Sequence, residues 1–334
     1  MEDSPKIRLK FHEHRKISPP GKRHWFPRMF RLPDGSILQN DATCDDTMEA
    51  LEQKGSGALR RSIDGGDTWQ EMATPPRFGM PVLLKDGRLR SFGYRIWPGP
   101  DNTLCGMMSD LPPGSNEWTK EERFEISLPH SVTFGCLPRG VQVQPDGTFL
   151  AALYGKWTGD HRDSSFIVSS DDDGRTWRYR SCIARGQKSF GEGFNEPVLC
   201  RTADNGLLCV MRTGGGYSPL HSCRSDDDGF TWSKPSNLGT YSVSPDLYLM
   251  SNGILACSFG RPWIQMTFSL DGNGTTWTDP VTIVASRGNS TCYTAVVEAA
   301  PGRLVVVYDQ NLDGPPWFAD DNYIKALLID IEFC

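Results

Sequence analysis

The chain has 334 residues, of which 38% are hydrophobic and 23% are charged, and its formal net charge is −6. This acidic balance, with no block of lysines and arginines, argues against a nucleic acid or an anionic membrane surface as the partner. No apolar run is long enough to cross a bilayer as a helix, so we expect no membrane insertion. The opening residues, MEDSPKIRLK, lack the apolar core of a signal sequence. We therefore expect a cytoplasmic protein, or a secreted one if a signal has been removed.

The ten cysteines are scattered, and no CxxC or Cys/His pair has the spacing of a zinc site. Without a signal sequence we expect these thiols to be reduced. The sequence contains no cofactor motif, so we expect no cofactor. The bulk properties leave open a large, single-unit all-β fold, because such folds often exceed the usual domain length.

From the N-terminus onward, the chain reads as a succession of short strands. After the strand-like IRLKFHEH, apolar runs are interrupted by six turn dipeptides: Asp34-Gly35, Asp86-Gly87, Asp146-Gly147, Asn205-Gly206, Asn252-Gly253 and Pro301-Gly302. Asp-Gly and Asn-Gly favour two-residue hairpin turns, in which both central residues take positive φ angles. Successive turn glycines lie 47 to 60 residues apart, which suits four short strands per unit.

A second repeat, Ser-x-Asp-x-Gly-x-Thr-Trp, follows these turns in phase. Three copies end at Trp69, Trp177 and Trp232, and a fourth, ending at Trp277, carries one inserted residue. Asp can accept backbone hydrogen bonds in a tight turn, Gly supplies a positive φ, and Trp packs beneath the turn. The copies lack the later Glu of an EF-hand loop, so we expect a structural role and no metal. The second unit retains only Trp118 of this pattern.

This repeat resembles the Asp-box of the sialidase-type β-propellers. An internal repeat of this length indicates one closed ring, and the resemblance implies a six-bladed β-propeller of four-stranded antiparallel blades. We expect a single domain over residues 1–334. The ring would be closed by pairing of the N-terminal strand with the C-terminal segment YIKALLIDIEFC.

Charged and phenolic residues recur at one end of the predicted hairpins, where the units would meet at the mouth of a central channel. Before the turns stand Arg28, Arg139, Glu196 and Tyr293, and after them stand Arg212, Arg261 and Asp309. Clustered guanidinium groups repel one another and require partners when buried. They would suit an anionic ligand. Alternatively, each arginine pairs locally with a carboxylate.

Three segments are similar to sialidase motifs in family order: GFNEPVLCRTADNGLLCVMR, GILACSFGRP and TCYTAVVEAAPGRLVVVYD. The resemblance implies that Arg212 and Arg261 bind the substrate carboxylate and that Tyr293 attacks the anomeric carbon. Glu196 would be the base that makes the phenol nucleophilic. Sialidases use such a tyrosine in a retaining mechanism. Asp309 would lie beside Tyr293 and join the arginines in binding the substrate.

The chain departs from the sialidase pattern at two places. Trp25, in HWFPRMF, occupies the position of the first arginine of the sialidase triad, and either Arg28 or Arg139 could supply the third guanidinium. The acid/base aspartate is expected in the loop QNDATCDDTMEALEQKGSG. We favour Asp46, then Asp45, over Asp41.

Two other functions fit the same pattern. The segment FPRMFRLPDGSIL resembles the opening of exo-arabinanase propellers as well as that of sialidases. A neutral-sugar glycosidase of that type would use Glu196 as one of two carboxylates, with Arg212 and Arg261 orienting the substrate. A non-catalytic propeller that binds glycans or assembles other proteins is the third possibility, because Asp-boxes also occur there. In the first two cases the partner is a glycan or glycoconjugate substrate.

Overall fold

The structure, a computed structural model, describes residues 7–20, 22–186, 191–215, 218–285, 291–310 and 322–333. In these ranges the protein is all-β, with one short helix, α1 (Met48–Leu51), and strands β1 to β27. None of the described helical residues forms a segment long and apolar enough to cross a bilayer.

Three of the sheets have four strands each and are antiparallel throughout, in chain order. The first contains β3 (Trp25–Arg31), β4 (Ile37–Ala42), β5 (Gly57–Ser62) and β6 (Gln70–Glu71). The second contains β17 (Asn195–Arg201), β18 (Leu207–Arg212), β19 (Pro219–Ser225) and β20 (Ser236–Tyr241). The third contains β21 (Val243–Leu249), β22 (Leu255–Gly260), β23 (Ile264–Ser269) and β24 (Val281–Val284).

A fourth sheet joins the two ends of the chain. It contains β25 (Thr294–Ala300), β26 (Arg303–Gln310), β27 (Tyr323–Phe333), β1 (Ile7–Phe11) and the short β2 (Arg15–Lys16). Strand β1 pairs antiparallel with β27, from Ile7 opposite Phe333 to Phe11 opposite Ile329. The last strand of the chain is therefore covered on its outer side by the first, and the short, largely exposed β1 becomes the edge strand of the sheet.

The region of the second and third predicted units forms one ten-stranded sheet, which differs from the expected separate four-stranded sheets. Its strands are β7 (Gly79–Leu83), β8 (Leu89–Gly93), β9 (Arg95–Pro98), β10 (Thr103–Leu111), β11 (Glu122–Ser127), β12 (Val132–Cys136), β13 (Gln142–Val143), β14 (Phe149–Trp157), β15 (Ser164–Ser170) and β16 (Thr176–Ala184). Strands β9 and β12 pair with each other, and β11 pairs with β16 in parallel. Seven strands, β9 to β12 and β14 to β16, thereby close into a barrel.

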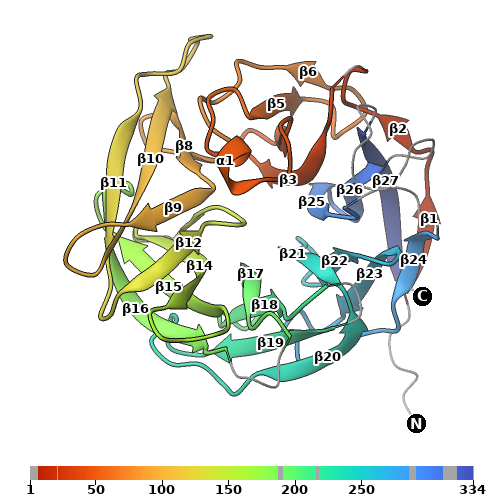
Figure 1. Ribbon diagram of the computed structural model, residues 1–334. Coiled ribbons are helices and arrows are strands. Elements are labelled where there is room, and N and C mark those ends of the chain that lie inside the picture. Colours follow the sequence, from red (N-terminus) through yellow and green to blue (C-terminus); the bar gives the residue numbers. More distant parts are fainter. Residues whose placement is uncertain are drawn as a thin grey trace.

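The sheets are arranged in a ring (Figure 1). Strands β3, β17, β21 and β25 lie nearest the centre, and β3 contacts β25 while β17 contacts β21. The apolar core is distributed between neighbouring sheets; Val305 and Val307 of β26, for example, pack in one cluster with Met29 of β3. The centre of the ring is consequently bordered by β3, β17, β21 and β25.

The Asp-boxes form the turns that their sequence predicts. In the first copy, Asp64 accepts hydrogen bonds from the Ser62 hydroxyl (2.8 Å) and the Thr68 backbone N–H (2.9 Å), and Trp69 donates from Nε1 to the Gly66 carbonyl (3.1 Å). A Cβ at Gly66 would stand 2.6 Å from Val305 in the adjacent sheet. The box therefore packs one sheet closely against the next.

The hairpin turns differ from the expected type. At Asp34-Gly35 only the glycine has positive φ (86°), and the Gly35 N–H donates to the Leu32 carbonyl (2.9 Å). The Asp34 side chain accepts from the Ser36 N–H (2.9 Å). In the Asn205-Gly206 turn the left-handed residue is Asn205 itself (φ 69°). Each of these turns has one left-handed residue and not two. In both, an aspartate side chain (Asp34 or Asp204) accepts a backbone N–H two residues later, which stabilises the turn without a second positive φ.

Candidate functional site

The same backbone irregularity recurs in three central strands. Strands β3, β17 and β21 each have a shift in pairing register near their first residues. At each shift a non-glycine residue has positive φ and is followed by proline: Phe26 (56°) before Pro27, Glu196 (45°) before Pro197, and Ser244 (49°) before Pro245. Such bulges redirect a side chain out of the regular alternation of a strand. Here they place Phe26, Glu196 and Ser244 in the wall of one cavity.

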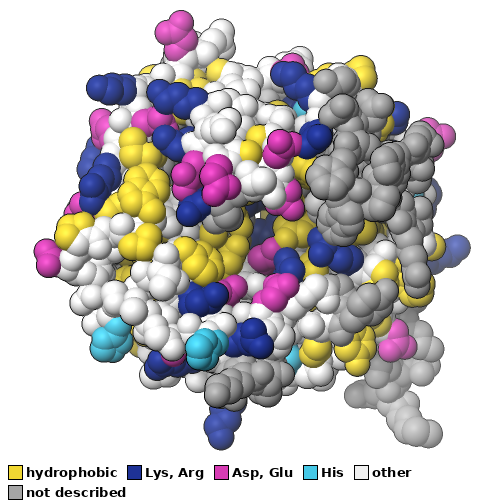
Figure 2. Space-filling view, viewed as in Figure 1, with side chains coloured by type: hydrophobic (Ala, Val, Ile, Leu, Met, Phe, Trp, Pro, Cys, Tyr) yellow, Lys and Arg dark blue, Asp and Glu magenta, His cyan; other side chains and the backbone are white. Residues whose placement is uncertain are grey.

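That cavity has a volume of about 290 Å³ and is bordered by several of the sheets. Basic and acidic side chains gather around a hollow at the centre of the molecule (Figure 2). The charged and phenolic residues that line the cavity are Arg28, Asp46, Tyr94, Arg139, Tyr154, Glu196, Arg212, Arg261 and Tyr293. The structure thus brings together seven of the nine residues singled out from the sequence, and adds two tyrosines.

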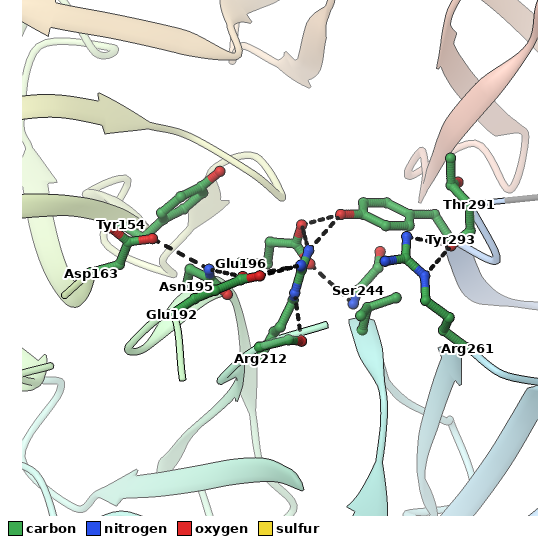
Figure 3. Close-up of polar contacts among 12 residues, drawn as sticks. Tyr154, Asp163, Glu192, Asn195, Glu196, Arg212, Ser244, Arg261, Thr291 and Tyr293 are labelled. Carbon is green, nitrogen blue, oxygen red and sulfur yellow. Dashed lines mark hydrogen bonds and ion pairs between the residues drawn. The ribbon is translucent and has the colours of Figure 1, made fainter. Parts of the chain in front are cut away.

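Tyr293 and Glu196 are directly hydrogen-bonded, with the phenol donating to Glu196 Oε1 (Figure 3). The same oxygen lies 2.8 Å from Arg212 Nη1, which is also 3.1 Å from the Tyr293 hydroxyl. The other carboxylate oxygen accepts from the Ser244 N–H (3.1 Å). Burial opposes ionisation of Glu196, but Arg212 and the Tyr293 hydroxyl hold its pKa below the usual range. Burial and the Glu196 charge raise the pKa of Tyr293. At neutral pH the pair is therefore a carboxylate and a neutral phenol.

Arg212 has a protein partner in each direction. Its Nε donates to the Gly214 carbonyl (2.9 Å), Nη1 to Glu196, and Nη2 forms an ion pair with Glu192 (3.0 Å). Burial alone would lower the pKa of Arg212, but the neighbouring carboxylates raise it. The local pairing considered as an alternative therefore applies to this arginine.

Arg261 lies beside the phenol of Tyr293, with its guanidinium carbon 6.0 Å from the ring centroid. Its backbone is left-handed (φ 63°). The Nε and Nη2 groups both donate to the Thr291 carbonyl, at 3.2 and 3.0 Å. This carbonyl fixes the plane of the guanidinium next to the predicted nucleophile (Figure 3).

Arg28 lies in a different part of the cavity, against aromatic rings. Its guanidinium carbon is 4.3 Å from the Phe78 ring centroid and 5.1 Å from that of Tyr94. The side chain is buried, and among the described residues Nη1 has no hydrogen-bond partner. Burial and the nearby charge of Arg139 lower the pKa of Arg28 to about 10. Arg139 itself donates from Nη2 to the carbonyl and hydroxyl oxygens of Ser244, at 2.9 and 2.6 Å.

The three candidate aspartates have different surroundings, and Asp41 belongs to strand β4 and not to the expected loop. Asp46 lines the open side of the cavity, where its side chain remains accessible to solvent; partial desolvation by its surroundings raises its pKa against the opposing charge of Arg261. Asp45 does not line the cavity; its exposed carboxylate pairs with Arg23. Asp41 is fully buried and accepts a hydrogen bond from His24 (2.6 Å). Of the three, only Asp46 is positioned to meet a ligand in this cavity.

Asp309 does not line the cavity, so the expected direct contact with a substrate is not supported. It is completely buried and accepts hydrogen bonds from the Thr291 N–H (3.2 Å) and the Tyr293 N–H (3.0 Å). The carboxylate therefore organises the backbone on both sides of Cys292, the residue before Tyr293. Cys292 has positive φ (56°), which is unfavourable for a non-glycine residue. The hydrogen bonds to the Asp309 carboxylate stabilise this backbone conformation.

Sequence reasoning missed four polar residues of the site: Tyr94, Tyr154, Glu192 and Ser244. A signal for the two tyrosines was present, because each follows the turn glycine of its unit by seven residues, as Asp309 does in the last unit. Trp25 is buried and donates from Nε1 to the Cys44 carbonyl (2.8 Å). The place of the first sialidase arginine is thus filled by a core aromatic residue. In the described part of the chain, no cluster of His, Cys, Asp or Glu could hold a metal ion.

The fold is similar to that of several proteins of known structure. A protein of unknown function from Dyadobacter fermentans has a TM-score of 0.74 and 19% identity, covering 97% of this chain and 99% of that chain. The microbial sialidase Hadza Hz136 has a TM-score of 0.64 and 18% identity, covering 91% and 65%. An α-L-arabinanase from Penicillium chrysogenum has a TM-score of 0.67 and 16% identity, covering 96% and 98%. These likenesses show a fold shared with β-propeller glycoside hydrolases, and the fold alone.

No curated protein matches the chain significantly in sequence. A family model described as BNR repeat-like domain, however, matches residues 75–306. This segment is more than half of the chain and carries three of the four predicted Asp-boxes. The chain therefore belongs to the family of BNR repeat-like domain proteins.

Proposed function

We propose that the protein is an exo-acting, retaining glycoside hydrolase that removes a terminal acidic sugar by a sialidase-like mechanism. The observation that carries this proposal is the hydrogen bond from Tyr293 to Glu196 at the floor of a charged cavity. A buried phenol next to an ionised carboxylate matches the arrangement of a nucleophile with its general base. A non-catalytic propeller would have no use for this pairing.

The mechanism follows from the protonation states. Tyr293 Oη would attack the anomeric carbon while its proton passes to Glu196, and Arg212 would stabilise the negative charge shared by the two oxygens. Asp46, whose pKa is raised by partial desolvation, would donate its proton to the departing glycosidic oxygen. In the second step, water would attack the anomeric carbon and displace Tyr293, while Asp46 acts as the base that accepts the proton of the water. The departing phenolate would recover its proton from Glu196. Two inversions give net retention.

The cluster of arginines supports an anionic substrate. Arg28, Arg139, Arg212 and Arg261 line one cavity, and among the described residues its acidic lining consists of Glu196 and Asp46. Among these lining residues the arginines outnumber the carboxyls four to two, while Glu192 pairs with Arg212 and Asp246 lies outside the cavity lining near Arg139. Buried guanidinium groups in excess of carboxylates are unfavourable unless an anionic ligand compensates them.

A neutral-sugar glycosidase of the exo-arabinanase type is the second candidate, and two observations favour it. Trp25 fills the position of the first sialidase arginine, and both terminal nitrogens of Arg212 already pair with carboxylates. In that case Glu196 would itself be the nucleophile and Asp46 the acid, with Tyr293 orienting Glu196. The similarity to an arabinanase fold is compatible with this alternative.

We further propose that the ring has six blades and is one domain over residues 1–334. On this reading, β7, β8, β10 and β11 form the second blade and β13 to β16 form the third, while β9 and β12 are additional strands that join the two. The pairing of β1 with β27 supports the closure of the ring.

The proposal is tested by hydrolysis of a fluorogenic sialoside, arabinofuranoside and glucuronide by the wild-type protein and Tyr293→Phe. Tyr241→Phe, which alters an exposed phenol, is the matched control. Turnover of an acidic sugar that collapses only in Tyr293→Phe supports the proposal. Turnover of the arabinofuranoside alone, with part of it surviving in Tyr293→Phe, supports the second candidate. No turnover of any glycoside by a folded protein overturns both.

A further inference from the structure

We propose that Arg28, with Arg139 and the phenols of Tyr94 and Tyr154, forms a recess that binds a carboxylate remote from the anomeric carbon. The substrate would then be a glycoside of a uronic acid and not of a 2-keto sugar acid. This inference rests on the proposed glycosidase function and specifies which acidic sugar the cavity accepts.

The first argument is that Arg28 has no carboxylate within ion-pair distance among the described residues. Among the same residues, its buried Nη1 has no hydrogen-bond partner. The rings of Phe78 and Tyr94 cover the guanidinium without supplying an acceptor. Buried charged groups are normally paired. Because Arg28 lines the cavity, a ligand anion is the partner that this geometry provides for.

The second argument is the donor capacity of the two phenols. The hydroxyls of Tyr94 and Tyr154 are 2.6 Å apart, so one donates to the other, and the second proton is shared between the Cys136 sulfur, which hydrogen-bonds both phenols, and a ligand acceptor. Burial raises the pKa of both tyrosines well above the usual value, which keeps them neutral. The pKa of the Cys136 thiol beside them is raised to about 11 by burial. The recess thus offers guanidinium and hydroxyl donors and no negative charge of its own.

Two acidic groups interact electrostatically with this recess: Glu196, whose charge acts on both phenols, and Asp246, whose charge acts on Arg139 and Arg28. The Asp246 carboxyl accepts a hydrogen bond from the Val296 N–H (2.9 Å), and burial raises its pKa although Arg139 and Arg28 oppose this. Asp246 does not line the cavity that holds Tyr293 and Glu196. It therefore reduces the positive charge below the recess but does not occupy the donors that face the ligand.

The third argument is the distance of this recess from the nucleophile. Tyr154 and Tyr293 lie at opposite sides of the site, with Glu196 and Arg212 between them (Figure 3). In a 2-keto sugar acid the carboxylate is bonded to the anomeric carbon itself and must lie beside the nucleophile. There, Arg212 is already paired with two carboxylates, and Arg261 donates twice to the Thr291 carbonyl.

In a uronic acid the carboxylate is carried by C5, which the ring oxygen separates from the anomeric carbon, so it lies farther from the nucleophile than the carboxylate of a 2-keto sugar acid. A ring with its anomeric carbon at Tyr293 would direct that carboxylate across the cavity, toward Arg28 and the phenols. The volume of about 290 Å³ is at the small end of ligand pockets and suits one sugar residue. The separation of Arg28 and the two phenols from Tyr293 thus suits the carboxylate of a terminal uronate.

The experiment measures hydrolysis of fluorogenic glycosides of glucuronic, galacturonic and iduronic acid in both anomeric forms. Each is assayed beside the neutral sugar that has a CH₂OH group in place of the carboxylate, and beside a sialoside. We expect at least one uronide to be cleaved with a kcat/KM about 30-fold or more above that of its neutral counterpart, as a desolvated charge pair implies. Arg28→Lys and Tyr154→Phe should raise KM for the uronide more than they lower kcat. They should also greatly reduce the ratio of kcat/KM for the uronide to kcat/KM for the neutral sugar.

Arg185→Lys, an exposed arginine that pairs with Asp160, is the control, and thermal unfolding verifies that each variant folds. Because Arg28 is buried, Tyr154→Phe, which removes one hydroxyl only, provides an independent variant if Arg28→Lys fails to fold. Cleavage of the sialoside with no effect of either variant would overturn the recess while the proposed function stands.

If no glycoside is cleaved, the proposed function fails, and calorimetric binding of the free uronic acids still decides the inference. Binding that is lost in Arg28→Lys and Tyr154→Phe supports the recess. Absence of binding of every uronic acid to the folded wild-type protein overturns it.

Discussion

Glu196 and Tyr293, 97 residues apart in the chain, meet in one hydrogen bond at the centre of the ring. Each is brought there by a left-handed residue, since Glu196 itself has positive φ and Cys292 has positive φ immediately before Tyr293. Neither conformation is favourable for a non-glycine residue. The ring therefore maintains local strain at the two positions where we propose that the chemistry takes place.

Glu196→Gln should retain the size of the side chain and lose its basicity. The phenol would have no group to accept its proton, so we expect kcat to fall about 100- to 10,000-fold, with a smaller effect on KM. Glu122→Gln, on the exposed side of β11, is the control for removal of a carboxylate. The measurement is steady-state hydrolysis of whichever glycoside the wild-type protein cleaves. A loss of less than tenfold would show that Tyr293 does not depend on this carboxylate.

Asp46→Asn and Asp45→Asn separate the two adjacent aspartates. Asp46 lines the cavity and Asp45 pairs with Arg23 outside it, so only Asp46→Asn should lose the general acid. We expect its rate to fall steeply for glycosides with a poor leaving group and far less for activated aryl glycosides, which need little protonation. Equal losses in both variants would contradict the assignment.

The pH profile provides a related prediction for the same residue. The acid form of Asp46 is needed for the first step, and partial desolvation raises its pKa. The base Glu196 must be ionised, and its pKa is held below the usual range. Activity should therefore rise as pH increases through the pKa of Glu196 and fall as pH increases through that of Asp46. In Asp46→Asn the falling limb at higher pH should disappear. Its persistence would assign that limb to another group.

Much of this arrangement could be predicted from the sequence, because repeated short-range patterns determine it. The Asp-boxes bind their own backbone, as Asp64 does, and need no distant partner to be recognised. The positions of residues relative to the turn glycines likewise predicted that Glu196, Arg212, Arg261 and Tyr293 would lie at one end of the hairpins, and all four line one cavity.

The rest depended on contacts that no local pattern contains. The parallel pairing of β11 with β16 unites two predicted units into one sheet, and nothing in either segment indicates the other. Asp45 and Asp46 are chemically identical neighbours, and only the direction of each side chain separates a surface ion pair from a cavity wall. Asp309 stood at the correct strand end, but it faces the backbone beneath Tyr293 and not the cavity.

Asp309→Ala should destabilise the protein as well as lower its activity. It would leave the N–H groups of Thr291 and Tyr293 without their acceptor in a buried site, for which we expect a loss of about 2–4 kcal/mol in the free energy of unfolding. Asp67→Ala, an exposed residue paired with Arg15, should change it by less than about 0.5 kcal/mol. Urea denaturation measures both. Equal stability of the two variants would show that the segment before Tyr293 is held by other contacts.

The Asp-boxes should make stability depend on pH in the acidic range. Hydrogen bonds from Thr231 and Ser225 lower the pKa of Asp227 from 3.8 to about 2, and similar bonds lower that of Asp172. A carboxylate whose pKa is lower in the folded state stabilises it fully above the unfolded value, and that contribution disappears as pH falls through the folded value. The urea midpoint should therefore decrease between about pH 4 and pH 2. In Asp227→Asn the midpoint should be lower at neutral pH, and the difference from wild type should shrink across that interval. A difference that stays constant from pH 6 to pH 2 would show that the ionised carboxylate of Asp227 does not stabilise its turn.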